Sequence, residues 1–226
     1  MTSGRNNTAA RGRQAWHDAN CADCARLSDF LAEVKRARPD YMCKPVPPFG
    51  ARRAELLVVG LAPGLRGANA TGRPFTGDHA GILLYRMLHR FGFASAPHSR
   101  ARDDGLRLRN CRVTNAVKCL PPGNKPLGAE VANCSRYLAA ELAEPHLKLV
   151  LALGGVAHRA VLRALGLKLS AYPFAHAARH ELGNGLALFD SYHCSRYNTN
   201  TRRLTEEMFA RVFAQVAARL KKAGAA

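Results

Sequence analysis

The chain has 226 residues, of which 47% are hydrophobic and 22% are charged, with 19 Gly and 12 Pro. This is the composition of a globular protein, so collagen-like and disordered classes are excluded for the body of the chain. Lys and Arg number 34 against 16 Asp and Glu, and the net charge of +18 indicates a polyanionic partner such as a nucleic acid.

No apolar run reaches the ~20 residues that a membrane helix needs. Residues 1–16 are polar, contain arginines and lack the hydrophobic stretch of a secretory signal. We therefore expect no membrane partner and a cytoplasmic, nucleoid-associated protein of bacterial type. Residues 1–18 are predicted to form a flexible basic arm and residues 19–222 a single domain, with the protein acting as a monomer.

The hydrophobic pattern alternates between helices and strands along the chain. Apolar residues at three- and four-residue spacing predict helices, and short continuous apolar runs predict strands that are buried on both faces. In chain order the predictions are a helix at 22–37, a strand at 55–60, a helix at 79–91, a strand at 112–117, a helix at 128–143, a strand at 148–153, a helix at 156–165, a strand at 186–190 and a helix at 203–220. The segments between them, including 94–110 and 166–185, are predicted loops. This alternation predicts a layered α/β fold with a mostly parallel sheet.

Ligands of such folds bind outside the carboxyl ends of the strands, and three loops leave those ends. The first, residues 60–78, reads GLAPGLRGANATGRPFTGD and is neither a G-x-G-x-x-G turn nor a P-loop. Its glycines permit a close approach of backbone to a phosphate or a base. Taken alone, this loop is also typical of a strand-to-helix connection in which Asp78 caps the helix that begins near His79.

The other two loops are rich in polar side chains that can form hydrogen bonds. In TNAVKCLPP, residues 114–122, Asn115 ends a strand and can read a base edge through its paired donor and acceptor, or satisfy the local backbone. In SYHCSRYNTNTRRLT, residues 191–205, His193 is set among hydroxyl, amide and guanidinium groups. A polar turn before a helix is the alternative there, although the arginines and the many hydrogen-bonding groups in this one loop make that alternative less favourable.

Seven cysteines in a chain without a secretory signal do not suggest a disulfide framework. Cys21 and Cys24 form a C-A-D-C pair, and the next candidates are Cys119, just before a Pro-Pro-Gly turn, and Cys134. Four thiolates can hold a structural zinc ion or an iron–sulfur cluster, and their spacing does not decide between the two. Buried cysteines without a metal remain the third possibility. The scattered histidines at 158, 176 and 180 are assigned to the surface or to phosphate contacts rather than to a metal.

Taken together, the three loops strongly resemble the uracil-DNA glycosylase superfamily, and most closely family 5, the type b enzymes. GLAPG…TGRPFTGD resembles the first family motif, TNAVKCLPPGNKP the middle strand and its loop, and SYHCSRYNTNT the second motif. The resemblance runs from about Cys21 to the C-terminal helix. It implies a three-layer α/β/α sandwich around a central four-stranded, mostly parallel sheet. It also implies a [4Fe–4S] cluster, with the ligands Cys21, Cys24, Cys119 and Cys134.

The function implied by this resemblance is that of a monofunctional DNA-repair glycosylase acting on DNA that contains uracil or other deaminated bases. It would flip out uracil, and also hypoxanthine and xanthine, and release it by hydrolysis to leave an abasic site. The catalytic candidates are Asp78, Asn115 and His193. The substrate-binding candidates are Gly60, Ala62, Phe75, Asn115 and His193. The DNA-binding candidates are Arg73, Ser195, Arg196, Asn198, Arg202 and Arg203.

Each catalytic candidate has a chemical role. Phe75 resembles the family's residue that stacks on the base, and Asn115 matches the asparagine that reads the Watson–Crick edge. His193 can donate a hydrogen bond to the base carbonyl and stabilise the leaving anion. Asp78 is the candidate for positioning the attacking water and stabilising the cationic sugar. No lysine is placed as a Schiff-base nucleophile.

Two positions depart from better-known relatives. Leu61 and Ala62 follow the opening glycine where several families place an acid or a polar group, a feature that family 5 shares, so the water-positioning residue is less certain. Cys194 follows His193 where proline is usual, and we assign it to packing. Two alternatives remain open: a non-catalytic nucleic-acid-binding module stapled by zinc, and a narrower family 4-like enzyme specific for uracil.

Overall fold

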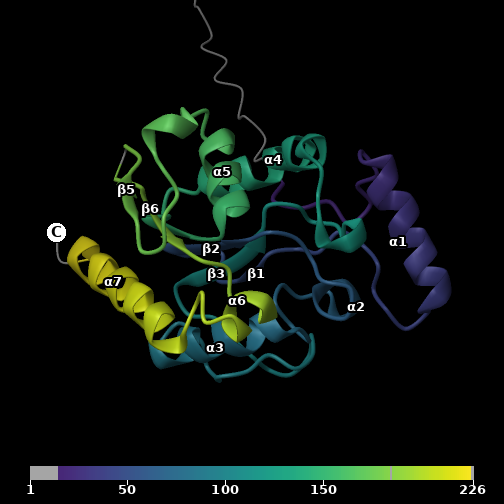
Figure 1. The fold of residues 1–226 in the computed structure, drawn as a ribbon, viewed down its shortest axis with the longest axis horizontal. Coiled ribbons are helices and arrows are strands. Elements are labelled where there is room, and N and C mark those ends of the chain that lie inside the picture. The colour runs from purple at the N-terminus through teal and green to yellow at the C-terminus, as the bar shows by residue number, and fades with distance from the viewer. Residues whose placement is uncertain (1–14, 184, 225–226) are drawn as a thin grey trace, which may run out of the picture.

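The computed structural model describes residues 15–183 and 185–224, and a six-stranded mixed sheet runs through its middle (Figure 1). The strand order is β1-β3-β2-β4-β6-β5. Its centre consists of four parallel strands: β3 (Cys111–Asn115), β2 (Leu56–Gly60), β4 (Leu149–Leu153) and β6 (Ala187–Ser191). Every residue of these four strands is buried, which explains why each reads as a continuous apolar run.

The sheet has two strands more than the four that were expected. β1 (Phe49–Gly50) pairs antiparallel with β3 at one edge, and β5 (Arg179–Glu181) pairs antiparallel with β6 at the other. Both are short and partly exposed, so they leave no hydrophobic pattern in the sequence. The four-stranded parallel core is confirmed, and the full strand count is corrected to six.

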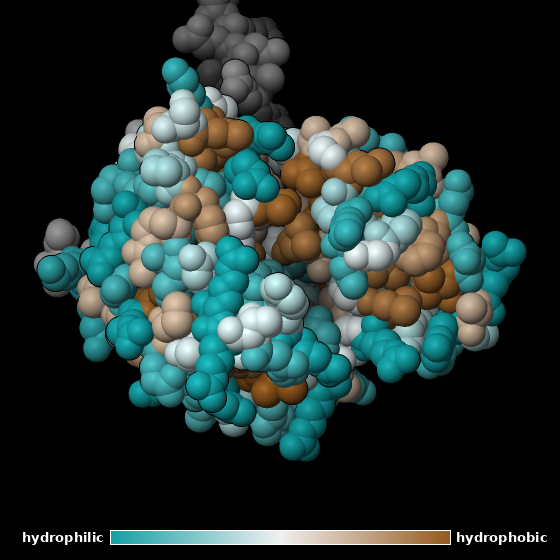
Figure 2. Space-filling view, viewed as in Figure 1, coloured by the Kyte–Doolittle hydropathy of each residue, from teal (hydrophilic) through white to brown (hydrophobic). Residues whose placement is uncertain are grey.

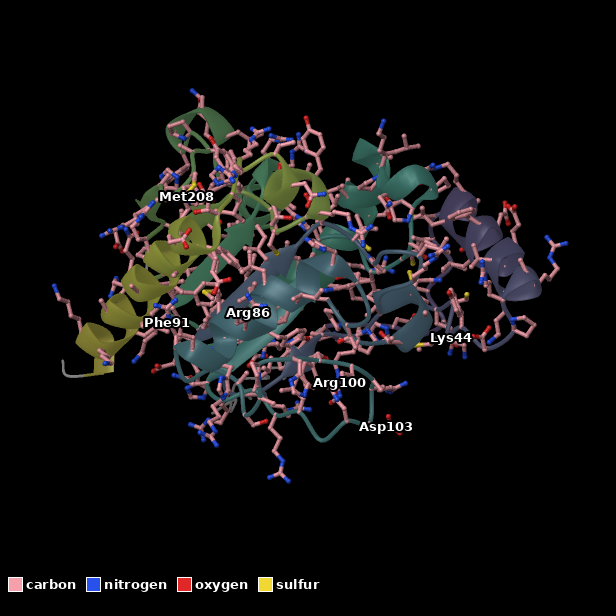
Figure 3. The ribbon with its side chains drawn as sticks, turned by 60° about the horizontal axis from the view of Figure 1, so that its bottom comes forward. Lys44, Arg86, Phe91, Arg100, Asp103 and Met208 are labelled. Carbon is pink, nitrogen blue, oxygen red and sulfur yellow. The ribbon has the colours of Figure 1, made fainter. Side chains whose placement is uncertain are left out.

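Helices cover both faces of the sheet and complete the predicted three-layer sandwich (Figure 1). On one face lie α4 (Gly128–Leu142) and α5 (Gly155–Ala164), with α1 (Ala25–Ala37) packed beside them. On the other lie α3 (His79–Arg90) and α7 (Glu206–Gly224). Each helix buries one apolar face in one of two hydrophobic clusters, which the sheet separates. Figure 3 turns α3 and α7 forward and shows Phe91 at their contact, where its ring stacks on Phe213 at a centroid distance of 5.9 Å.

Short helices occupy segments that were predicted as loops. α2 (Ala68–Thr71) lies between β2 and α3, and α6 (Arg196–Asn200) lies between β6 and α7. Single turns of 3₁₀ helix occur at Pro122–Asn124 and Leu169–Ala171. The residues of these short helices are small or polar and show no apolar periodicity. Local capping hydrogen bonds, rather than hydrophobic packing, therefore set where the helices form. The side chain of Ser195, for example, accepts the backbone N–H of Asn198 at the start of α6.

The structure describes the end of the predicted N-terminal arm, and there it differs from the prediction. Residues 1–14 of the predicted arm lie outside the described residues. Trp16 instead packs on the body of the protein: its indole N–H donates to Glu144 at 3.1 Å, and its ring covers the guanidinium of Arg112 at 3.8 Å. His17 contacts the carbonyl oxygen of Pro45 at 2.7 Å. The flexible arm predicted to reach residue 18 therefore does not include these two residues.

The chain order of the central strands fixes where a site can form. β2 lies in the middle of the sheet, β3 is added on one side of it, and β4 and β6 on the other. Such a reversal of direction opens a crevice outside the carboxyl end of the first strand, here at Gly60. None of the helices in the described part of the chain is long and apolar enough to cross a membrane.

Candidate functional site

A pocket of about 430 Å³ lies at this carboxyl edge of the sheet. All three predicted loops contribute to it, and its lining consists of Leu61, Ala62, Gly64, Ala68, Phe75, Asp78, His79, Ala80, Asn115, Asn124, His193, Ser195 and Arg196. Figure 2 shows a hollow with hydrophobic side chains in its wall near the middle of this face, above the position of α6. The predicted catalytic candidates are thus brought together, although they are far apart in the sequence.

Asn115 is the last residue of β3 and lies opposite Gly60 in the parallel register. Its side chain is only 4% exposed, and its Oδ1 has no hydrogen-bond partner among the described residues. A buried acceptor without a partner costs free energy of about 1–3 kcal/mol. An N–H donor of a ligand in the pocket would remove that cost.

Gly60 is what allows Asn115 and Phe75 to lie so close together. A Cβ atom at this position would lie 2.4 Å from Asn115 Oδ1 and 2.4 Å from the ring of Phe75. Phe75 itself adopts a left-handed backbone conformation with φ of 55° and is 5% exposed. Its ring stacks on His193 with a centroid distance of 6.0 Å and an interplanar angle of 28°. The two rings form an apolar wall of the pocket.

His193 lies in the pocket just after β6, and Asn198 fixes its backbone by donating from the side-chain amide to the His193 carbonyl at 2.8 Å. Burial lowers the pKa of His193 to about 4, because the charged imidazolium is poorly solvated there. At neutral pH the ring is therefore uncharged and carries one N–H that can donate a hydrogen bond.

Asp78 caps a helix and also lines the pocket. It is the N-cap of α3, where its Oδ1 accepts the backbone N–H of Gly81 at 2.9 Å, and it also lines the pocket. Burial raises its pKa above the usual value of an aspartic acid, and the N–H groups of Gly81 and Ala80 partly offset this effect. Gly67 leaves room for the carboxylate, since a Cβ there would lie 2.5 Å from Asp78 Oδ2.

Five of the six DNA-binding candidates divide into two groups. Arg196, Arg202 and Arg203 are exposed beside the pocket, and the guanidinium of Arg203 lies 4.7 Å from the centre of the Tyr192 ring. Ser195 and Asn198 instead hold the local backbone, as described above.

Arg73 does not fit its predicted DNA contact. Its side chain is 4% exposed, pairs with Asp104 at 2.7 Å and donates to Ser99 at 2.9 Å. It therefore ties the first motif to the loop of residues 95–110, on which Figure 3 labels Arg100 and Asp103. The sequence does not reveal this pairing, because Asp104 lies 31 residues further along the chain than Arg73.

Two polar lining residues, His79 and Asn124, are not among the candidates from the sequence. His79, to which no role was given, donates to or accepts from Thr199 Oγ1 at 2.9 Å and links the first motif to α6. Asn124 lines the pocket from the 3₁₀ turn after β3 and has a φ of 57°. Its place directly after the Pro-Pro-Gly turn that follows Asn115 is the signal that could have pointed to it.

A second, smaller cavity is enclosed by the four predicted metal ligands. Cys21, Cys24, Cys119 and Cys134 all line it, and they come from the start of α1, the loop after β3 and α4. Burial, reinforced by the neighbouring cysteines, raises the pKa of Cys119 to about 12. Four sulfur donors around one cavity suit a zinc ion or an iron–sulfur cluster, and Asp23, Ser28 and Asn133 line the same cavity.

Three of these sulfur atoms also have N–H donors close by. The backbone N–H of Lys118 lies 3.4 Å from Cys134 Sγ, the side-chain amide of Asn133 lies 3.5 Å from Cys24 Sγ, and the Arg136 guanidinium lies 3.6 Å from Cys21 Sγ. Such donors stabilise thiolates, the form that binds a metal. The remaining cysteine prediction is confirmed, since Cys194 is fully buried in the core between the sheet and α7.

The histidine assignment is wrong for two of the three residues. His158 is 2% exposed and His180 is 11% exposed, and both contact the buried carboxylate of Asp190. Only His176 lies apart from this carboxylate, with its ring stacked on Tyr192 at 5.0 Å.

Comparison with known proteins gives consistent results. The family model described as "Uracil DNA glycosylase superfamily" matches residues 47–217. A type-5 uracil-DNA glycosylase of Thermus thermophilus is 47% identical over 198 residues, which cover 85% of this chain and 90% of that protein. Two further type-5 uracil-DNA glycosylases are similar: that of Mycobacterium tuberculosis is 44% identical over 85% of this chain and 75% of its own length, and that of Pyrobaculum aerophilum 41% identical over 91% and 94%.

Proposed function

The chain belongs to the uracil-DNA glycosylase superfamily, with type-5 enzymes among its relatives, and from this we propose that it excises uracil from DNA in base repair. The reaction is hydrolysis of the N-glycosidic bond, which leaves an abasic site. The observation that carries the proposal is the buried, unpartnered Oδ1 of Asn115 in a pocket that also holds Phe75 and an uncharged His193.

A base inside a duplex cannot reach a buried amide, so the nucleotide must first be flipped into the pocket. The net charge of +18 and the exposed arginines at 196, 202 and 203 support binding through the phosphates around the flipped base. The ring of Phe75 offers the stacking surface, which contributes ~1–3 kcal/mol per base in such sites. Asn115 Oδ1 accepts from an N–H on the Watson–Crick edge, and its amide donates to a neighbouring carbonyl.

Cleavage leaves negative charge on the base and positive character on the sugar. The neutral ring of His193 donates a hydrogen bond from its N–H to the base carbonyl as that charge develops. It stabilises the leaving base without being a cation itself. The carboxylate of Asp78 holds the attacking water and stabilises the cationic sugar. Its raised pKa makes it a better proton acceptor than an ordinary aspartate.

We also propose that the base range includes hypoxanthine and xanthine. The apolar Leu61 and Ala62 line the pocket at the end of β2. They offer no polar side chain that would select one base by hydrogen bonding.

We propose that Cys21, Cys24, Cys119 and Cys134, which line one cavity, are the ligands of a [4Fe–4S] cluster. Bound there, the cluster would supply a structural cross-link between α1, α4 and the loop that follows Asn115. An iron–sulfur protein is brown and absorbs near ~400 nm, whereas a zinc protein is colourless. Absence of this absorbance in protein purified without oxygen would contradict the iron–sulfur assignment.

A base-release assay tests the catalytic proposal. End-labelled duplexes that carry uracil, hypoxanthine or xanthine are incubated with the protein and then treated with alkali. We expect alkali-dependent strand cleavage that falls about 10²–10³-fold in His193→Ala, with DNA affinity nearly unchanged. His89→Ala, an exposed histidine of α3 outside the pocket, is the matched control and should keep full activity. DNA binding without base release by the wild type would favour the non-catalytic binding module instead.

A further inference from the structure

Three side chains from three elements converge on the α5 side of the sheet, away from the four cysteines. His158 projects from α5, His180 from β5 and Asp190 from β6, and one ligand atom of each lies within 4.8 Å of the others. His158 Nδ1 lies 2.8 Å from Asp190 Oδ1, and His180 Nε2 lies 3.3 Å from Asp190 Oδ2. The edges of the two imidazole rings face one another at a centroid distance of 5.6 Å.

The hydrogen bonds of His158 imply that a cation lies between its ring and the carboxylate of Asp190. Its Nε2 lies 2.8 Å from the carbonyl oxygen of Tyr172, which only accepts, so Nε2 carries a proton and donates. A neutral imidazole has no second N–H, and the lone pair of Nδ1 then faces a carboxylate oxygen at 2.8 Å. Two electron pairs at this distance repel each other, so a cation must lie between them. That cation is either a proton, bound to the ring or to the carboxyl group, or a metal ion.

We propose that His158, His180 and Asp190 form a second metal site, for a divalent ion of the zinc class, separate from the cysteine cavity. Two imidazole nitrogens and one carboxylate are a donor set that such ions bind. Zinc bonds of ~2.0–2.1 Å in a tetrahedron place the ligand atoms about 3.3 Å apart. The observed nitrogen–oxygen separations of 2.8 and 3.3 Å, each to a different oxygen of Asp190, are close to this value.

The surroundings support this assignment. Histidines that ligate a metal usually donate their other N–H to a carbonyl or carboxylate, as His158 does to Tyr172. The rings of Tyr172 and Phe174 pack edge-on against the two histidines at 5.7 and 5.6 Å and shield the site. His180 is 11% exposed, which gives an ion a path from solvent.

The role of this ion would be to hold the strand that leads to the candidate active site. Asp190 lies three residues before His193 on the same strand and loop, and β5 is otherwise held at the sheet edge by a short antiparallel pairing. A metal bridging α5, β5 and β6 would fix that edge from the side opposite α7.

The test measures zinc directly and does not depend on base release. Purified protein with its native cysteine centre intact is treated with a mild chelator, equilibrated with Zn²⁺ alone and freed of excess metal. Zinc per chain is measured by plasma mass spectrometry, and the thermal unfolding midpoint is measured with and without Zn²⁺. We expect the wild type to hold about one zinc more per chain than His180→Ala. We also expect Zn²⁺ to raise the midpoint of the wild type but not that of the variant.

Matched variants locate the zinc. His176→Ala removes a nearby histidine that does not contact Asp190 and should bind zinc as the wild type does. Cys21→Ser should lose only zinc that is held by thiols, not the zinc that His180→Ala removes. Should His180→Ala fail to fold, His180→Gln keeps a polar side chain at this partly exposed position and is expected to lose the same zinc. Equal zinc in the wild type and the His180 variants, or none in either, would overturn the proposal and leave a proton as the cation.

Discussion

At the scale of single residues, the glycine at position 60 decides how close Asn115 and Phe75 can lie. A methyl group there would meet the Asn115 oxygen and the Phe75 ring at 2.4 Å, so both must move. Misplacing groups by about 1 Å can cost ~10²-fold in rate. We therefore expect Gly60→Ala to lower kcat for uracil release by about 10²-fold. Gly128→Ala is the control, since no atom lies within 4 Å of the added methyl, and equal activity of the two variants would contradict this account of the pocket.

The pH profile of base release is set by two pocket residues with opposite pKa shifts. The pKa of His193 is lowered from 6.5 to about 4, so this ring stays neutral as the pH falls through 6.5. Burial raises the pKa of Asp78, so its carboxylate is lost at a higher pH than an ordinary aspartate. We expect single-turnover rates measured between about pH 5 and 8 to show no histidine step. Any acid limb should disappear in Asp78→Asn, and an acid limb that persists in this variant would remove Asp78 from the water-positioning role.

The same substitution separates the two roles of Asp78. A carboxyl whose folded-state pKa is raised holds its proton better in the folded protein, so it favours folding at low pH and loses that benefit as pH rises through the raised pKa. Asparagine caps helices about as well as aspartate. Urea unfolding at neutral pH should thus show Asp78→Asn to be as stable as the wild type or slightly more stable, although its base release falls. A large loss of stability would show that the negative charge serves the fold.

At the scale of elements, a buried ionic network joins α4 to β3 and its loop. Glu141 contacts Lys118 at 2.8 Å, Thr114 at 2.9 Å and Arg112 at 3.2 Å, and all four side chains are buried. Removing one partner of a buried ion pair costs about 3–5 kcal/mol, because a charge is left uncompensated. We expect Glu141→Gln to lower the free energy of unfolding by about that amount in urea titrations. Glu206→Gln breaks an exposed pair with Arg86 and should cost at most ~1 kcal/mol, so equal losses would contradict the argument.

Local patterns predicted the elements that bury most apolar surface. The four central strands lie within two residues of their predicted bounds, because each is a continuous apolar run. The helices at α3 and α4 begin at the predicted residues, and Asp78 caps the first of them as expected. Edge strands β1 and β5 and the short helices α2 and α6 are held by pairing and capping, which no hydrophobic period reveals.

Polar residues were predicted less well, because burial of a charge depends on a partner that is distant in sequence. Arg73 and His158 were predicted to be surface residues, because nothing near them in the sequence indicates a buried partner. In the structure Arg73 pairs with Asp104, and His158 contacts Asp190. The pocket residues Phe75, Asn115 and His193 could be named in advance, because they belong to motifs that resemble those of the uracil-DNA glycosylase superfamily. Their mutual distances, and the unpartnered oxygen of Asn115, needed the fold.

At the scale of the whole molecule, the net charge of +18 should make DNA binding strongly dependent on salt. Each phosphate contact adds about one unit to the slope of log K against log salt concentration. We expect Arg203→Ala, which removes an exposed guanidinium, to reduce that slope by about one unit. Arg73→Ala should leave the slope unchanged and lower stability instead, since Arg73 is paired inside the protein. A reduced slope for Arg73→Ala would show instead that Arg73 contacts a DNA phosphate, as the sequence predicted.

The network around Glu141 also bears on the product of the proposed reaction. An enzyme that cuts the DNA backbone as well as the glycosidic bond needs a free amine to form an imine with the sugar. Lys118 follows Asn115 by only three residues, yet its side chain is 2% exposed and its amine contacts Glu141 and Thr114. Among the described residues that line the pocket there is no lysine. The DNA would then be released with its backbone intact at the abasic site, and a separate endonuclease would be needed to cut the strand there.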